Sequence, residues 1–190
     1  MRALLLVALL VLLAACARTP PAQYYLLVAP DASTVGAEGG TRVGLGPVRL
    51  PDYLDRPQIV SWENATRLRL SNRHRWAEPL QKSFSRVLFA RLAQALPEAT
   101  LVPWPWRGAQ TPARQIAVDV QRFERGADGV LHLDARWTVQ SGAAAAPRVF
   151  DSAIALPVAG EPEDYDAIVA AASAAVGALA TDIAQRLPPP

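Results

Sequence analysis

Two long stretches of the chain repeat apolar residues at three- and four-residue steps, the spacing of one helix face. The first covers 78–96, where Pro79 suits an opening turn and Pro97 ends the repeat. The second covers 163–187 and is rich in alanine, which allows close packing. We therefore expect two main helices. Their apolar faces comprise Leu80, Phe84, Val87, Leu88, Leu92 and Ala95 in the first, and Ile168, Ala172, Val176, Leu179 and Ile183 in the second.

Apolar and polar residues instead alternate one by one in the segments 114–124, 130–139 and 148–156. This period is typical of strands with one buried face, and the glycine-rich turn at 126–129 predicts that the first two form a hairpin. The alternation changes phase before Phe123, which predicts a bulge. Shorter strands are expected at 24–28, 41–50, 58–62 and 67–70. In the second of these, Gly44, Gly46 and Pro47 indicate a bend or an edge position.

This order of elements predicts an α+β fold. We expect a mostly antiparallel sheet with the two main helices packed on one face, in a single domain. The chain after residue 15 has 175 residues (190 − 15), a length that suits one domain with a sizeable core.

The N-terminus has the organisation of a secretory signal. Arg2 precedes an apolar run, 3–13, which is shorter than the about 20 residues needed to span a bilayer. Leu13-Ala14-Ala15-Cys16 then places small residues before the only cysteine of the chain, which matches the bacterial lipobox. In lipobox proteins the cysteine receives a diacylglycerol thioether and a further acyl chain. The alternatives are an ordinary signal with an incidental cysteine and an N-terminal membrane helix.

The lipobox divides the chain into three parts. Residues 1–15 are expected to be a cleaved signal peptide, 16–23 a lipidated tether beginning at Cys16, and 24–190 the folded domain. Ala17 follows the cysteine, whereas retention in the inner membrane usually requires Asp there. We therefore expect a protein anchored by lipid to the periplasmic face of the outer membrane.

Charge and candidate chemistry favour a protein that is not an enzyme. The formal net charge of +2 becomes +1 when Arg2 is removed, which argues against binding nucleic acid. There is no Gly-x-Ser-x-Gly elbow and no glycine-rich phosphate loop. His132 and Asp134 share a strand face that could hold a metal, but a solvated polar face is the favoured interpretation. No catalytic residue, cofactor or metal is expected.

Two segments combine tryptophan with features suited to recognition. The first mixes aromatic and basic residues, which suits lipid phosphates or an acidic partner; the alternative is internal ion pairing with buried tryptophans. The second, Pro103-Trp104-Pro105-Trp106, places Trp104 and Trp106 in a stiff loop for a membrane surface or partner pocket, or for core packing. The first segment contains Trp62, Arg67, Arg69, Arg73, His74, Arg75 and Trp76.

Several stretches together resemble one family. They are Tyr24-Tyr25-Leu26-Leu27 after the lipobox, the long block 46–60, Arg75-Trp76-Ala77-Glu78-Pro79-Leu80, Pro105-Trp106, and the hairpin with Phe123-Glu124 and Ala135-Arg136-Trp137. Over nearly the whole mature chain, the sequence resembles the PqiC (YmbA) family of ABC-type transport auxiliary lipoproteins. The resemblance implies an outer-membrane lipoprotein that works with a membrane-spanning MCE-domain partner in lipid transport between membranes, and it implies a homo-oligomeric ring. It brings no catalytic residues.

Within the resembling region, 51–62 is the expected partner surface. Tyr53, Arg56, Gln58 and Trp62 are residue types suited to recognition, and Pro51 and Pro57 lower the cost of ordering the backbone. Arg75 and Trp76 complete the candidate interface, although they could instead serve packing at the helix start. Alternatively, Tyr53 and Ile59 belong to the core and Arg56 pairs internally. The competing function is a lipoprotein activator or assembly factor for cell-wall or outer-membrane machinery, and a periplasmic hydrolase is disfavoured.

Overall fold

A computed structural model describes residues 21–29, 40–107, 111–142 and 145–187. The predicted signal peptide and the predicted lipidation site, Cys16, lie outside these residues. The described residues form the α+β fold expected from the sequence, with two helices and one open mixed sheet.

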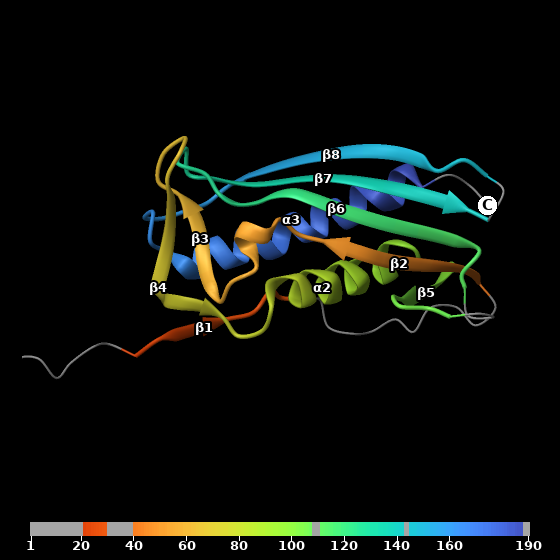
Figure 1. Ribbon diagram of the computed structural model, residues 1–190, viewed down its shortest axis with the longest axis horizontal. Coiled ribbons are helices and arrows are strands. Elements are labelled where there is room, and N and C mark those ends of the chain that lie inside the picture. The colour runs from red at the N-terminus through yellow and green to blue at the C-terminus, as the bar shows by residue number, and fades with distance from the viewer. Residues whose placement is uncertain (1–20, 30–39, 108–110, 143–144, 188–190) are drawn as a thin grey trace, which may run out of the picture.

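The sheet is built around its longest hairpin (Figure 1). β6 pairs antiparallel with β7, and β7 pairs antiparallel with β8. Along its other side β6 pairs in parallel with both β2 and β3; β5 then lies parallel to β2, while β4 and β1 extend the sheet beyond β3. The strands are β1 (Gln23–Tyr25), β2 (Thr41–Arg49), β3 (Gln58–Trp62), β4 (Leu68–Trp76), β5 (Ala99–Pro103), β6 (Arg114–Arg125), β7 (Val130–Ser141) and β8 (Arg148–Pro157).

Both helices cover one face of the sheet, as expected. α2 (Leu80–Ala95) packs on β2 and β5, α3 (Tyr165–Arg186) packs on β6, β7 and β8, and the two helices pack on each other. The Asp164 side chain accepts a hydrogen bond from the Ala167 N–H at 3.0 Å and caps the start of α3. By length and composition α3 could cross a membrane. Half of its apolar window is buried in this domain, however, and packing in the core explains why the helix is so apolar.

The bulge predicted in β6 is present and positions the residues discussed below. The register with β7 shifts between Val120 and Arg122, so Phe123 and Glu124 are both buried, on opposite faces of the strand. Phe123 faces the helices and meets Phe84 of α2 edge to face, with ring centroids 5.1 Å apart. Glu124 is consequently buried on the face that carries no helix.

The bend predicted in β2 is confirmed, but its alternative, an edge position, is wrong. β2 lies between β5 and β6, and its register with β6 shifts between Leu45 and Val48. The glycines have another cause, which is the tryptophan loop packed over them. A Cβ atom on Gly44 would lie 2.8 Å from the Trp106 ring, and one on Gly46 would lie 2.4 Å from the Trp104 Cβ.

Candidate functional site

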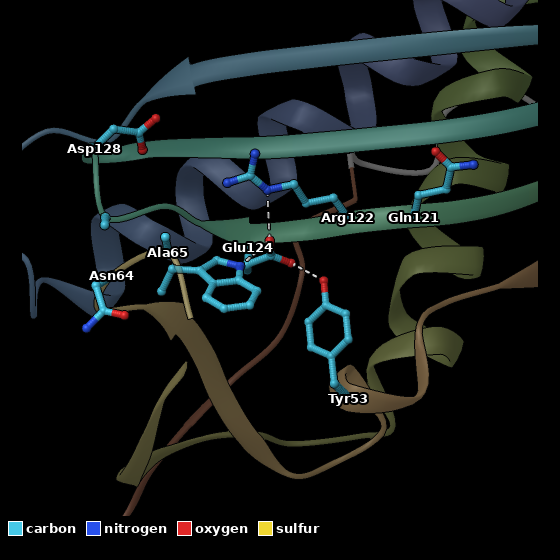
Figure 2. Close-up of a pocket in the computed structure, with 9 residues that line it drawn as sticks. Tyr53, Asn64, Ala65, Gln121, Arg122, Glu124 and Asp128 are labelled. Atoms are coloured by element: carbon cyan, nitrogen blue, oxygen red, sulfur yellow. Dashed lines mark hydrogen bonds and ion pairs between the residues drawn. The ribbon is translucent and has the colours of Figure 1, made fainter. Parts of the chain in front are cut away.

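A buried carboxylate organises the segment in which the partner surface is expected. Glu124, whose side chain is 1% exposed, accepts hydrogen bonds from the Tyr53 hydroxyl at 2.6 Å and from the Trp62 indole Nε1 at 2.9 Å. Arg122 Nε donates to the same carboxylate at 3.0 Å, and the Phe123 backbone N–H donates at 2.9 Å. Figure 2 shows the carboxylate between Arg122 and Tyr53. We call Glu124, Tyr53, Trp62 and Arg122 the Glu124 brace.

The brace joins three pieces of the chain that are distant in sequence. Tyr53 belongs to a short 3-10 helix, η1 (Asp52–Leu54), and Trp62 ends β3, so Glu124 fastens both to β6. Burial, and next the hydrogen bond to Glu124, raise the pKa of the Tyr53 hydroxyl above its ordinary value. Because four donors surround the buried carboxylate, its charge is compensated where solvent is excluded. The brace therefore holds the loop in one shape, which suits a recognition surface.

An open groove of about 600 Å³ runs along the brace. Its walls combine aromatic rings with polar groups, an arrangement suited to holding side chains of a partner. Asp128 at its rim accepts a hydrogen bond from the Val130 N–H, which, with the nearby His132 ring, lowers the pKa of Asp128. The lining residues are Tyr53, Trp62, Asn64, Ala65, Gln121, Arg122, Glu124, Ala127 and Asp128.

The other four candidate interface residues lie at the opposite end of the β3–β4 pair. Gln58 and Arg75 are register partners, and both are half-buried. The Trp76 N–H donates to the Pro57 carbonyl at 2.7 Å, while its ring is buried in the core. Arg56 and Trp76 line a smaller pocket of about 330 Å³ before α2. The buried Nε of Arg56 has no hydrogen-bond partner among the described residues, and no ion pair is found for this side chain there.

For 51–62, the structure agrees with part of each alternative. Ile59 is buried in the core and the Tyr53 hydroxyl is used internally, but Arg56 forms no internal ion pair within the described chain. Tyr53 and Trp62 remain half-buried, so each side chain lines the groove while its polar atom donates a hydrogen bond to Glu124.

Internal pairing explains much of the basic segment around β4. Arg67 lies 2.7 Å from Glu63, and Arg69 lies 2.5 Å from Glu163, just before α3. His74 and Arg75 are tied into the fold as well, whereas Arg73 is exposed. His74 stacks on Tyr165 with ring centroids 3.9 Å apart, and its Nδ1 lies 2.8 Å from the Tyr25 hydroxyl. Arg75 Nε donates to the Asn72 carbonyl at 3.2 Å.

The tryptophan loop divides between core and surface. Trp106 is 9% exposed and meets Trp104 edge to face, with ring centroids 4.8 Å apart. Trp104 is 52% exposed and lines a second pocket, of about 520 Å³, together with Pro47 and Phe89. Of the two roles that the sequence left open, core packing thus applies to Trp106 and an exposed position to Trp104.

The two residues considered as metal ligands do share a face of β7. His132 and Asp134 are both half-buried, and His132 Nε2 lies 2.9 Å from Asp128 Oδ2 across the hairpin turn. Among the described residues, no group of three or more His, Cys, Asp or Glu could hold a metal ion. The arrangement fits a polar strand face with one local His–Asp contact.

Comparison with known proteins agrees with the sequence motifs. A model of a family described as the ABC-type transport auxiliary lipoprotein component matches residues 24–184. The chain belongs to this family. This confirms the resemblance drawn from the blocks at 46–60 and 75–80. A transport auxiliary lipoprotein is not an enzyme class, and the members are membrane-anchored components associated with a transport system. Among curated proteins, no sequence matches the chain.

Solved structures share the fold. A crystal structure of an uncharacterized protein is 20% identical, covers 89% of this chain and 100% of its own, and has a TM-score of 0.75. A DUF330-family protein from Xanthomonas campestris is 16% identical, with coverage of 85% and 92% and a TM-score of 0.65. At these identities the likeness supports the architecture alone.

Sequence reasoning missed the central role of Glu124. The pair Phe123-Glu124 stood out as a family motif, and the change of phase before Phe123 predicted the bulge. A buried acid directly after a bulge is the signal that could have been used, since it needs donors from elsewhere in the fold. Arg122, two residues earlier, supplies one of those donors.

Proposed function

We propose that this protein is a non-enzymatic subunit of an MCE-type intermembrane lipid transport complex, which docks the periplasm-spanning partner at the outer membrane. The observation that carries the proposal is that the two distinctive family blocks meet in space. Gln58, in the first block, is the register partner of Arg75 in the second, and the Trp76 N–H donates to the Pro57 carbonyl. The two blocks that carry the family resemblance therefore lie side by side where β3 begins and β4 ends.

The proposed partner surface consists of Tyr53, Arg56, Gln58, Trp62 and Arg75, supported from below by Trp76. The Glu124 brace orders this loop before binding, which lowers the entropic cost of association. Arg56 is the central residue of the proposed surface, because its charge has no ion pair among the described residues and its side chain is half-buried beside the pocket before α2. Arginine and aromatic residues are the types that most often dominate interface energies.

The test is a pull-down of the native lipoprotein from membranes, with identification of the proteins recovered. An MCE-domain protein is expected with the wild type, and Arg56→Glu should reduce its recovery about tenfold or more. Arg107→Glu, a charge reversal at an exposed site beyond Trp106, is the matched control and should leave recovery unchanged.

Stability must be measured on the same samples. Arg56→Gln removes the charge without adding an acid near Glu78, so a loss of recovery with both Arg56 variants and unchanged thermal unfolding supports the surface. Full recovery with a stable Arg56→Glu protein would refute the docking site, and absence of any MCE-domain protein from the wild-type sample would refute the function.

A further inference from the structure

The segment nearest the proposed lipid anchor carries exposed apolar side chains in a regular pattern. Among the described residues six large hydrophobic side chains are exposed, and three of them occur within five positions: Tyr24 at 65%, Leu26 at 46% and Val28 at 61%. We call these three residues the N-terminal ridge. Scattered exposed apolar residues are ordinary, whereas a cluster of them marks a contact surface.

The alternation of the ridge is fixed by the backbone. Between the ridge residues, Leu27 is buried in the core and Tyr25 is half-buried. The Leu27 N–H donates to the Ser83 hydroxyl of α2 at 3.3 Å, and the Val28 N–H donates to the Ser173 hydroxyl of α3 at 3.0 Å. Arg86 also donates to the Leu27 carbonyl, at 3.3 Å. The segment is therefore bound to both helices, which holds the ridge side chains outward.

The length of chain before the ridge limits what can cover it. Tyr24 is eight positions after Cys16, and a fully extended chain advances at most about 3.6 Å per residue, so the two lie within about 29 Å. A domain of this size has a radius of gyration of roughly 15 Å. An acylated Cys16 would therefore keep the ridge close to the bilayer that holds the acyl chains.

The neighbouring strand supplies charge that suits a lipid surface. The exposed Arg73 of β4 lies two residues before the register partner of Tyr24, and therefore on the same side of the sheet as Tyr24. Arginine beside apolar and tyrosine side chains is the combination that favours the boundary between headgroups and acyl chains.

We propose that the N-terminal ridge rests in the interfacial region of the membrane that holds the lipid anchor, as a second contact that fixes the orientation of the domain. This inference depends on the acylation of Cys16 that the lipobox predicts. With one anchor point the domain could rotate freely about the tether. A second, apolar contact would fix the orientation of the domain, so that the surface at Tyr53–Trp62 faces the partner.

The single cysteine makes a direct test feasible. Because the Cys16 sulfur is consumed by acylation, Leu26→Cys gives the mature lipoprotein one free thiol for an environment-sensitive fluorophore. Val149→Cys, at a site 55% exposed on β8, is the matched control. Both labelled proteins are reconstituted in vesicles of phosphatidylethanolamine and phosphatidylglycerol that contain a spin-labelled lipid quencher, and thermal unfolding verifies that each is folded.

The expected result is a blue-shifted emission at position 26 and quenching at least about threefold stronger than at position 149. Equal quenching at the two positions would overturn the proposal. A blue shift without quenching by lipid would also overturn it, because the ridge would then be covered by protein, such as a second copy of the chain. Failure of both proteins to float with the vesicles would instead refute the acylation of Cys16, and this inference with it.

Discussion

At the scale of single residues, Glu124 is the common hydrogen-bond acceptor beneath the proposed partner surface. Two of its four donors are side chains of the loop and of β3, Tyr53 and Trp62, which have no other hydrogen-bond partner in the described structure. An acid buried to this extent stabilises a fold only while its donors remain in place. The shape of the loop therefore depends on one carboxylate.

Replacing that carboxylate tests the brace. Glu124→Gln should lower the free energy of unfolding by about 2–4 kcal/mol, since the amide turns one acceptor into a donor and removes the charge facing Arg122. Urea unfolding followed by tryptophan fluorescence measures it. Asp151→Asn is the matched control: in its ion pair with Arg136 the two side chains are 65% and 54% exposed, so its effect on stability should be much smaller than that of Glu124→Gln. Equal effects of the two substitutions would contradict the role assigned to Glu124.

Tyr53 makes the same interaction sensitive to alkali. The raised pKa of its hydroxyl means that the folded state favours the neutral form, so this stabilisation is complete below about pH 10, the ordinary tyrosine value, and declines as the pH rises further. The stability of the wild type over Tyr53→Phe should be constant between about pH 7 and 9 and smaller at about pH 11. Urea unfolding at these three values measures the difference. A difference that stays constant or grows up to the highest pH would contradict the assignment.

At the scale of elements, β2 and the tryptophan loop form one packed unit. Gly46 has a positive φ of 130°, and a Cβ atom added there would lie 2.4 Å from the Trp104 Cβ. Gly142 has a positive φ of 72° as well, but a Cβ there would meet nothing within 4 Å. Gly46 thus combines a positive φ with a steric contact, whereas Gly142 has a positive φ alone.

Alanine substitutions make that difference measurable. Gly142→Ala should cost about 1–2 kcal/mol of unfolding free energy, the penalty for a left-handed backbone. Gly46→Ala should cost about 1–3 kcal/mol more, because its φ is less favourable for alanine and its Cβ also displaces the tryptophan loop, and the tryptophan emission of the protein should change with it. If both variants lose the same stability, packing of Trp104 over β2 is not the reason for the glycine.

Elements with strong periodicity were predictable from the sequence, whereas elements defined by their neighbours were not. The two helices, the 114–139 hairpin with its bulge and the strand at 148–156 follow from spacing alone. β5 was not predicted, because a five-residue parallel strand between two prolines has no alternation and exists through its pairing with β2. β4 continues to Trp76 through a polar stretch because β1 and β3 pair with it.

The same distinction applies to the site. Tyr53 and Trp62 were predicted to be important from their residue types, but the sequence could not show that both donate to one acid some 60 or more positions away. That contact depends on how β3 and η1 lie against the bulged end of β6. Likewise, burial of Trp106 and exposure of Trp104 depend on which ring covers β2.

At the scale of the whole molecule, the two proposed contact surfaces lie at one end. β1, β3 and β4 lie together at one end of the long axis, and β5 lies toward the opposite end (Figure 1). The proposed membrane contact and the proposed partner surface therefore share the anchored end. A subunit that docks a partner at a membrane needs this arrangement, since both contacts must form at once.

The membrane in which this end is anchored is the remaining choice, and residue 17 is expected to decide it. The wild type, with Ala17 after Cys16, should be recovered in the outer-membrane fraction, and Ala17→Asp should move the protein to the inner membrane while leaving its acylation intact. Cys16→Ser is the control that removes the anchor: without acyl chains, each of whose buried methylenes contributes about 0.8 kcal/mol, its mass should show no lipid. Separation of the two membranes by density, with mass spectrometry of each fraction, measures both effects. Wild-type protein in the inner membrane would contradict the proposed docking at the outer one, and an acylated Cys16→Ser protein would contradict the lipobox itself.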